Sequence, residues 1–269
     1  MKFCICNDPF QGWKLEDIFK YAAETGYQAV EIGPSTICDS VTELSQKDRE
    51  GIRNSAEKVG VEIAGLHGLF RSPSLHLNSP DVEIRLRTKQ YLRELIKFCS
   101  DIGGSDLVIG SGKNRNVVEG VSYEDAWGFA RDAFSECSKL AQQYRTNLCI
   151  EPLCHETTNF INTPDEAVKM VKEVNQPNFL WTLDVYGMNC QGVDIVQAIR
   201  KFSGYLGHVH VNDDNKSWPG SGGIDFKPIA KALKDIDYRG YISVEVFNFE
   251  PDPETIAQEA IKYMKAVFE

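Results

Sequence analysis

The sequence predicts an α/β protein that folds as a closed parallel (β/α)8 barrel, with residues 1–269 forming a single domain. Short apolar runs alternate with longer amphipathic runs along the whole chain, which is typical of strand–helix units around a parallel sheet. Eight such units fit in roughly the 250 residues that this barrel usually takes. An open doubly wound sheet is the alternative, but the chain has no GxGxxG after its first strand and no GxxxxGK[ST].

The eight predicted strands are short apolar runs rich in β-branched and aromatic residues, each followed by polar or glycine-containing segments. We expect them at Phe3–Cys6, Ala29–Ile32, Val61–Leu66, Leu107–Gly110, Leu148–Pro152, Phe179–Asp184, Leu206–Val211 and Tyr241–Val246. The connections after the third, fifth and seventh strands are long, as expected where loops at the carboxyl face of a barrel build a site.

The predicted helices show apolar residues at helical spacing and recognisable ends. Glycines stop the first two helices, and Thr163-Pro164 with Glu166 forms a capping box that starts the fifth. Asp252 and Pro253 start the last helix in the same way. We expect helices at about Leu15–Thr25, Ser45–Val59, Asp81–Ile102, Tyr123–Tyr144, from Thr163 onward, Ile195–Phe202, Lys227–Lys234, and from Asp252 almost to Glu269.

Composition limits the classes of partner. The formal net charge is −10 and no basic run occurs, which disfavours nucleic acids and anionic membrane surfaces as main partners. No apolar stretch approaches membrane-spanning length, and the first residues enter a strand without a signal-peptide pattern. The eight cysteines are scattered without a CxxC, so we expect reduced, mostly buried thiols in a cytoplasmic protein.

Four residues at the carboxyl ends of strands five to eight have side chains that bind divalent metals. Because side chains alternate along a strand, Glu151, Asp184, His210 and Glu245 would all point toward the barrel axis. Three buried carboxylates that meet without a partner would repel one another, and a divalent cation removes that repulsion. Three oxygen ligands and one imidazole favour Mn²⁺ or Mg²⁺, with Co²⁺ or Zn²⁺ as alternatives.

Other residues near the predicted mouth are candidates for substrate contacts. His67 follows strand three, and Lys113 and Arg115 follow strand four, where two cations could hold a carboxylate or phosphate. His155 and Glu156 lie just beyond strand five. His67 is alternatively a structural loop histidine, and Lys113 and Arg115 alternatively belong to a solvated loop.

Two further residues of the strands have open roles. Glu31, inward on strand two, either contacts substrate or forms an internal salt bridge. His208 shares a strand face with His210 and is better explained as a core or supporting histidine than as a metal ligand.

The ordered motifs of the second half resemble those of the xylose isomerase-like TIM barrels, and most closely the sugar phosphate isomerase/epimerase group, which is related to ketose 3-epimerases and inosose dehydratases. These motifs are Ile-Glu151-Pro-Leu, Leu-Asp184-Val-Tyr-Gly-Met-Asn, His208-Val-His210-Val-Asn-Asp, Pro219-Gly-Ser-Gly-Gly-Ile-Asp-Phe and Ser-Val-Glu245-Val-Phe. The resemblance implies a TIM barrel that binds one divalent metal through Glu151, Asp184, His210 and Glu245. It also implies a small carbohydrate substrate and a homodimer or homotetramer.

In that family the two glutamates act as an acid/base pair on opposite faces of the substrate. A carbonyl chelated by the metal has an acidified neighbouring proton, and the cation stabilises the enediolate that forms. One glutamate then removes the proton and the other returns it, which gives an epimerase or isomerase.

The chain departs from the ketose 3-epimerase pattern at positions that contact the sugar. Gly187 stands where a histidine is common, Lys216 where an arginine is, and Thr157 where a glutamate is, with Glu156 one place earlier. These changes favour a bulkier or differently bonded substrate. The alternatives are a lyase or dehydratase that uses the same metal site, a zinc phosphodiesterase resembling endonuclease IV, and a non-catalytic sugar-binding barrel.

Overall fold

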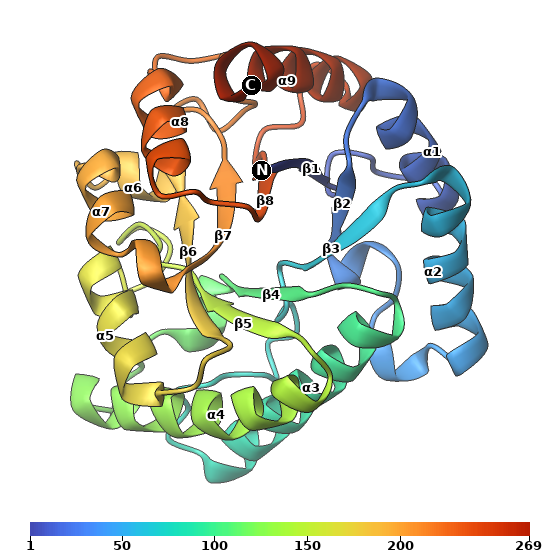
Figure 1. Ribbon diagram of the computed structural model, residues 1–269. Coiled ribbons are helices and arrows are strands. Elements are labelled where there is room, and N and C mark those ends of the chain that lie inside the picture. Colours follow the sequence, from blue (N-terminus) through green and yellow to red (C-terminus); the bar gives the residue numbers. More distant parts are fainter.

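A computed structural model describes residues 1–269 as eight parallel strands that close into a barrel, surrounded by helices (Figure 1). Each strand pairs with the next along the chain, and the last pairs with the first. The strands are β1 (Lys2–Cys6), β2 (Ala29–Ile32), β3 (Glu62–Leu66), β4 (Asp106–Ile109), β5 (Asn147–Ile150), β6 (Phe179–Asp184), β7 (Leu206–Val211) and β8 (Tyr241–Val244). The predicted (β/α)8 barrel is therefore confirmed.

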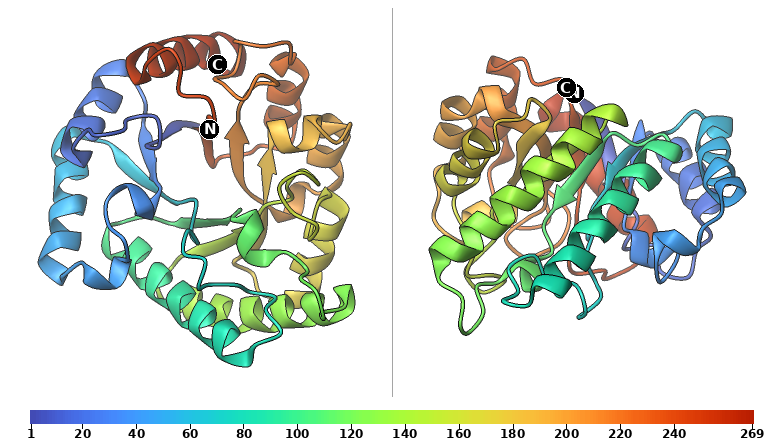
Figure 2. Two further views of the ribbon diagram at one scale, coloured as in Figure 1. Left: turned by 180° about the vertical axis from the view of Figure 1, so that it is seen from behind. Right: turned by 90° about the horizontal axis from the view of Figure 1, so that it is seen from below.

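The helices form an outer ring around the strands, as the views from behind and from below show (Figure 2). They are α1 (Leu15–Thr25), α2 (Gln46–Val59), α3 (Val82–Asp101), α4 (Tyr123–Gln143), α5 (Pro164–Val174), α6 (Val185–Asn189), α7 (Ile195–Lys201), α8 (Phe226–Asp235) and α9 (Pro253–Phe268). Short 3₁₀ helices occur at Pro34–Thr36, Val41–Glu43, Gly112–Arg115 and Ser203–Tyr205. Helix α6 was not predicted, because its five residues are too few to show a helical period. No helix is both long and apolar enough to cross a membrane.

Helix ends follow the signals in the sequence. The Thr163 side chain accepts a hydrogen bond from the backbone N–H of Glu166, whose carboxylate accepts one from the Thr163 N–H, and this capping box starts α5. Asp252 caps α9 in a similar way through the N–H of Thr255, at 2.7 Å. Gly26 ends α1 with a φ of 101°, a left-handed conformation that glycine adopts without strain.

The two faces of the strands pack against different surroundings. Outward residues such as Ile5, Val30 and Ile63 belong to a large apolar cluster between strands and helices. The inward positions next to them form a separate small cluster of Cys4, Ala29 and Ala64. The barrel interior also contains six buried polar side chains, which are those of Glu31, Asp106, Thr182, His208, His210 and Ser243. This barrel therefore has a polar interior instead of the usual layers of branched apolar residues.

The carboxyl ends of strands β5 to β8 carry the predicted ligand residues. Asp184 is the last residue of β6, and His210 lies in β7. Glu151 and Glu245 are the first residues after β5 and β8, which end earlier than predicted, at Ile150 and Val244. Both glutamates still continue the strand hydrogen bonding, because their N–H groups donate to Ile109 and Val211. The barrel closure thus brings all four residues to one mouth.

Candidate metal centre and active site

Glu151, Asp184, His210 and Glu245 converge at the carboxyl end of the barrel. Each offers one ligand atom, and these four atoms all lie within 4.8 Å of one another. His210 Nδ1 lies 3.0 Å from Glu151 Oε1 and 3.0 Å from Glu245 Oε2. Three of the four are buried, and Glu245 is partly buried. Four residues, each in or directly after a different strand, can therefore share one coordination shell.

The cluster carries more negative charge than its protein partners neutralise. Burial and the nearby Glu151 and Glu245 charges raise the pKa of Asp184 to about 8. Burial and the charge of Glu245 also raise the pKa of Glu151. Burial alone would lower the pKa of His210, but the Glu245 and Glu31 carboxylates raise it well above its usual value. Three carboxylates and an imidazole of this kind fit a hard divalent cation, which would let all three carboxylates ionise while the imidazole stays neutral.

Neighbouring groups hold the carboxylates in place. Asn212 Nδ2 donates to Asp184 Oδ2 at 2.8 Å, and the N–H of Gly187 donates to the other oxygen of Asp184. Arg115 donates to the backbone carbonyl of Glu151 at 2.5 Å. Outer contacts of this type orient ligands toward a metal. These hydrogen bonds orient the Asp184 carboxylate within the cluster.

Comparison with known proteins identifies the family. The family model described as "Xylose isomerase-like TIM barrel" matches residues 19–267. The chain belongs to this family.

The relatives of this xylose isomerase-like barrel include named sugar epimerases. A D-psicose 3-epimerase from Ruminiclostridium cellulolyticum is 28% identical over 88% of this chain and 80% of its own length. A 3-dehydro-D-guloside 4-epimerase from Escherichia coli is 21% identical over 98% of this chain and 99% of its own.

Solved structures show the same fold. D-psicose 3-epimerase from Clostridium cellulolyticum H10, with D-tagatose, superposes with a TM-score of 0.89 at 25% identity, and each chain is covered fully. The IOLI protein with a binding zinc atom has a TM-score of 0.80 at 20% identity, with 100% of this chain and 98% of that chain covered.

The metal cluster forms part of the wall of one large cavity of about 1010 Å³. Glu151, Asp184 and Glu245 line it. Of the residues predicted to contact substrate, four line the cavity: His67, Lys113, Glu156 and Lys216. Three do not, namely Glu31, Arg115 and His155. His155 is exposed on its loop, Arg115 is buried behind Glu151, and Glu31 lies in the barrel interior below the cavity floor.

Other lining residues were not singled out from the sequence. Asp8 pairs with His67, and Arg71 Nη2 lies 3.3 Å from Asp8 Oδ1. Tyr186 and Phe247 also line the cavity, with ring centroids 6.0 Å apart. Asp8, Tyr186 and Phe247 each follow a strand by two or three residues, so the rule that marked the metal ligands could have found them.

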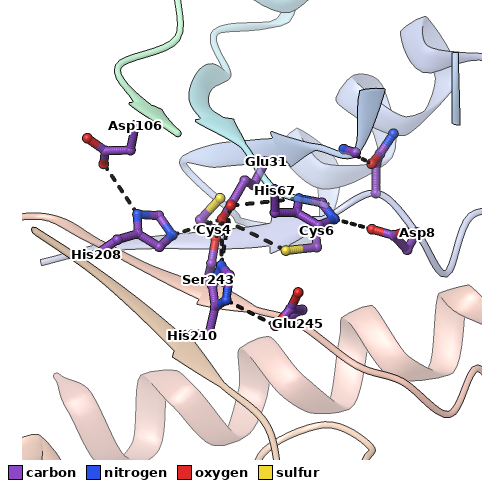
Figure 3. A network of polar contacts seen from close by, with 12 residues as sticks. Cys4, Cys6, Asp8, Glu31, His67, Asp106, His208, His210, Ser243 and Glu245 are labelled. Atoms are coloured by element: carbon purple, nitrogen blue, oxygen red, sulfur yellow. Dashed lines mark hydrogen bonds and ion pairs between the residues drawn. The ribbon is translucent and has the colours of Figure 1, made fainter. Parts of the chain in front are cut away.

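The barrel interior below the cavity contains a connected set of polar side chains (Figure 3). Glu31 is its centre: His208 Nε2 lies 2.9 Å from one carboxylate oxygen, and Ser243 Oγ donates to the same oxygen at 2.5 Å. Burial would raise the pKa of Glu31, but the charges of His208 and His210 hold it well below its usual value. Glu31 is therefore an internal salt-bridge residue in this structure, one of the two roles open to it.

The expectation of reduced thiols throughout is wrong for two cysteines. Cys154, in the loop after β5, is disulfide-bonded to Cys190, which follows α6. The two cysteines are 36 residues apart in the sequence, so no local pattern predicts their contact. They meet because β5 and β6 are neighbours in the barrel and the segments that follow these strands lie together. The remaining six cysteines are free, and five of them are buried. The bond joins the loop after Glu151 to the helix after Asp184.

Proposed function

We propose that this protein is a divalent-metal-dependent epimerase or isomerase of a sugar or sugar derivative, with Glu151 and Glu245 as its acid/base pair. The observation that carries the proposal is that a carboxylate oxygen of each glutamate lies 3.0 Å from His210 Nδ1. Both glutamates line the wall of the same large cavity. The named epimerases among the relatives support it.

The metal would be held by Glu151, Asp184, His210 and Glu245, and Mn²⁺ or Mg²⁺ suits this oxygen-rich set best. When bound, the ion polarises a substrate carbonyl and makes the neighbouring C–H more acidic. One glutamate takes that proton and the other delivers a proton to the opposite face of the carbon.

Solvent exchange tests this proposal directly. The purified protein, loaded with Mn²⁺ or Mg²⁺, is incubated in D₂O with a panel of ketoses and keto-glycosides, and NMR follows deuterium entering next to the carbonyl. Exchange with a product of unchanged mass, apart from deuterium, supports an epimerase or isomerase. An unsaturated product would indicate a lyase instead, and no exchange by the metal-loaded protein across the panel would contradict the proposal.

A keto-glycoside is the second candidate substrate, in place of a free ketose. The cavity of about 1010 Å³ is large for one hexose, because pockets of roughly 300–1,000 Å³ take drug-sized ligands. Gly187 lines the cavity but has no side chain to occupy part of that space. The relative that matches this chain over 99% of its own length is named for a 3-dehydro-D-guloside. Exchange with keto-glycosides but not with free ketoses, in the same panel, would favour this candidate.

A further inference from the structure

Glu31 contacts the His210 ring at the nitrogen that faces away from the metal cluster. It is fully buried in β2, and both of its carboxylate oxygens lie 3.3 Å from His210 Nε2. The opposite nitrogen of the same ring, Nδ1, faces Glu151 and Glu245. The His210 ring is therefore held between an interior carboxylate on one side and the cluster on the other (Figure 3).

We propose that Glu31 is a positioning residue that fixes the His210 ring so that its Nδ1 lone pair points at the metal. The inference rests on the proposed function, because it assigns His210 as a metal ligand. A histidine that binds metal through one nitrogen commonly donates its other N–H to a carboxylate, which sets the tautomer, the ring orientation and the basicity of the ligand. Glu31 is placed to accept that N–H.

Glu31 can orient His210 because it is itself held firmly. His208 Nε2 lies 2.9 Å from it, and Ser243 Oγ donates to it at 2.5 Å. His208 in turn lies 3.3 Å from Asp106 at the start of β4, and Asn147 donates to Asp106 at 2.8 Å. Residues of four strands besides its own, β4, β5, β7 and β8, thus fix one carboxylate, directly or through a neighbour.

A packing role alone would not require these residue types. Burying a charged group costs several kcal/mol for each ion. Well-packed apolar groups of similar volume therefore often stabilise a fold at least as much as a buried ion pair does. The interior of such barrels is ordinarily filled by Val, Ile and Leu. Here the interior instead holds an ionic network that ends on the ring of His210. Orientation of that ring is a use for the network that apolar packing could not supply.

Metal affinity tests the inference without requiring turnover. Purified metal-free Glu31→Gln protein, checked for native circular dichroism, is titrated with Mn²⁺ and free Mn²⁺ is read by electron paramagnetic resonance. We expect binding weaker than native by about 10- to 100-fold, the usual effect of removing an outer partner of a metal ligand. A folded Glu31→Gln protein with native Mn²⁺ affinity would overturn the inference.

A second pair of variants keeps the test decisive if Glu31→Gln does not fold. Ser243→Ala removes only the hydroxyl that donates to Glu31, and we expect weaker Mn²⁺ binding. Thr182→Val is the matched control, because its buried hydroxyl in the same barrel donates to the Cys149 carbonyl at 3.4 Å and not to Glu31. Equal Mn²⁺ affinities of these two variants would refute the positioning role.

Failure of the inference and failure of the proposed function give different results. Weaker Mn²⁺ binding by the variants together with no sugar exchange by the native protein would leave the positioning role and remove the epimerase. Deuterium exchange into a sugar by the native protein, together with unchanged Mn²⁺ affinity in Glu31→Gln, would support the epimerase and refute the positioning role of Glu31.

Discussion

Glu151 Oε1 and His210 Nδ1 lie 3.0 Å apart, although 59 residues separate them in the chain. Glu151 directly follows β5, and His210 lies in β7. Strand β6, which ends at Asp184, lies between these two strands in the barrel. Glu245 reaches the same nitrogen from the other side. Because one imidazole cannot neutralise three carboxylates, this contact leaves a surplus of negative charge that a divalent cation would balance.

The acid/base assignment predicts that Glu151→Gln and Glu245→Gln each slow proton exchange by about 10²- to 10⁴-fold, the usual contribution of general acid–base catalysis. Exchange into substrate is measured in D₂O at saturating metal. Glu156→Gln is the control, since Glu156 lines the cavity but lies outside the metal cluster. An equal loss in all three variants would show that the cluster glutamates have no special role.

The metal assignment predicts that divalent cations stabilise the native protein through Asp184. Mass action gives about 2.7 kcal/mol at a metal concentration 100 times the Kd, which raises the melting temperature. In Asp184→Asn protein the same addition of Mn²⁺ should produce a much smaller rise, because one ligand charge is lost. Differential scanning fluorimetry measures both. A full rise in Asp184→Asn would exclude Asp184 as a ligand.

The buried pair of His67 and Asp8 predicts a dependence of stability on pH. Burial would lower the pKa of His67, but Asp8 raises it to about 9. The folded state therefore keeps this proton more tightly than the unfolded state, so the stabilisation is complete below about pH 6.5 and is lost as pH rises through 9. The loss amounts to about 3 kcal/mol, because the His67 pKa is raised from 6.5 to about 9.

Urea unfolding at pH 6 to 9.5, with Mg²⁺ saturating so that the ligand carboxylates do not titrate, measures this dependence. His67→Gln should have a flatter profile than the native protein over that window. Parallel profiles for the two proteins would contradict the shifted His67 pKa.

The Cys154–Cys190 bond predicts a thiol count and a loss of stability. Of eight cysteines, two are bonded, so denatured unreduced protein should react at six thiols and reduced protein at eight. Cys190→Ser should lower the free energy of unfolding by about 2–4 kcal/mol, as typical for loss of a disulfide. Cys38→Ser, at a free and partly buried cysteine, serves as the control and should change little. Eight reactive thiols without reductant would disprove the bond.

The backbone at Gly187 predicts that even one added carbon disturbs the metal cluster. A Cβ there would lie 2.7 Å from Asp184 Oδ1 and 3.4 Å from the Pro152 carbonyl. Gly187→Ala should therefore displace the Asp184 carboxylate and weaken Mn²⁺ binding in a titration. Gly128→Ala, in α4 with open space around the added carbon, should leave Mn²⁺ affinity at its native value and slightly stabilise the helix. Native affinity in Gly187→Ala would show that Asp184 tolerates the contact.

The strands and most helices could be predicted because their signals are local. Alternation of apolar residues identified β6 and β7 with the bounds that the structure has, and capping residues placed the start of α5 and α9. The prediction erred at strand ends such as Ile150 and Val244, where pairing with a neighbouring strand decides the last hydrogen bond. Local sequence carries no information about that neighbour.

The sequence by itself predicted the barrel and the four residues that cluster at its mouth, because the period of apolar residues and the side-chain alternation in a strand are properties of the chain alone. Only the tertiary structure decided that Glu31 supports His210, that Asp8 pairs with His67, and that Cys154 meets Cys190. Each of these contacts joins separate strands or loops, and their distances depend on how the barrel closes. Long-range packing, which no local pattern encodes, thus sets the surroundings of the four clustered residues that the sequence already indicates.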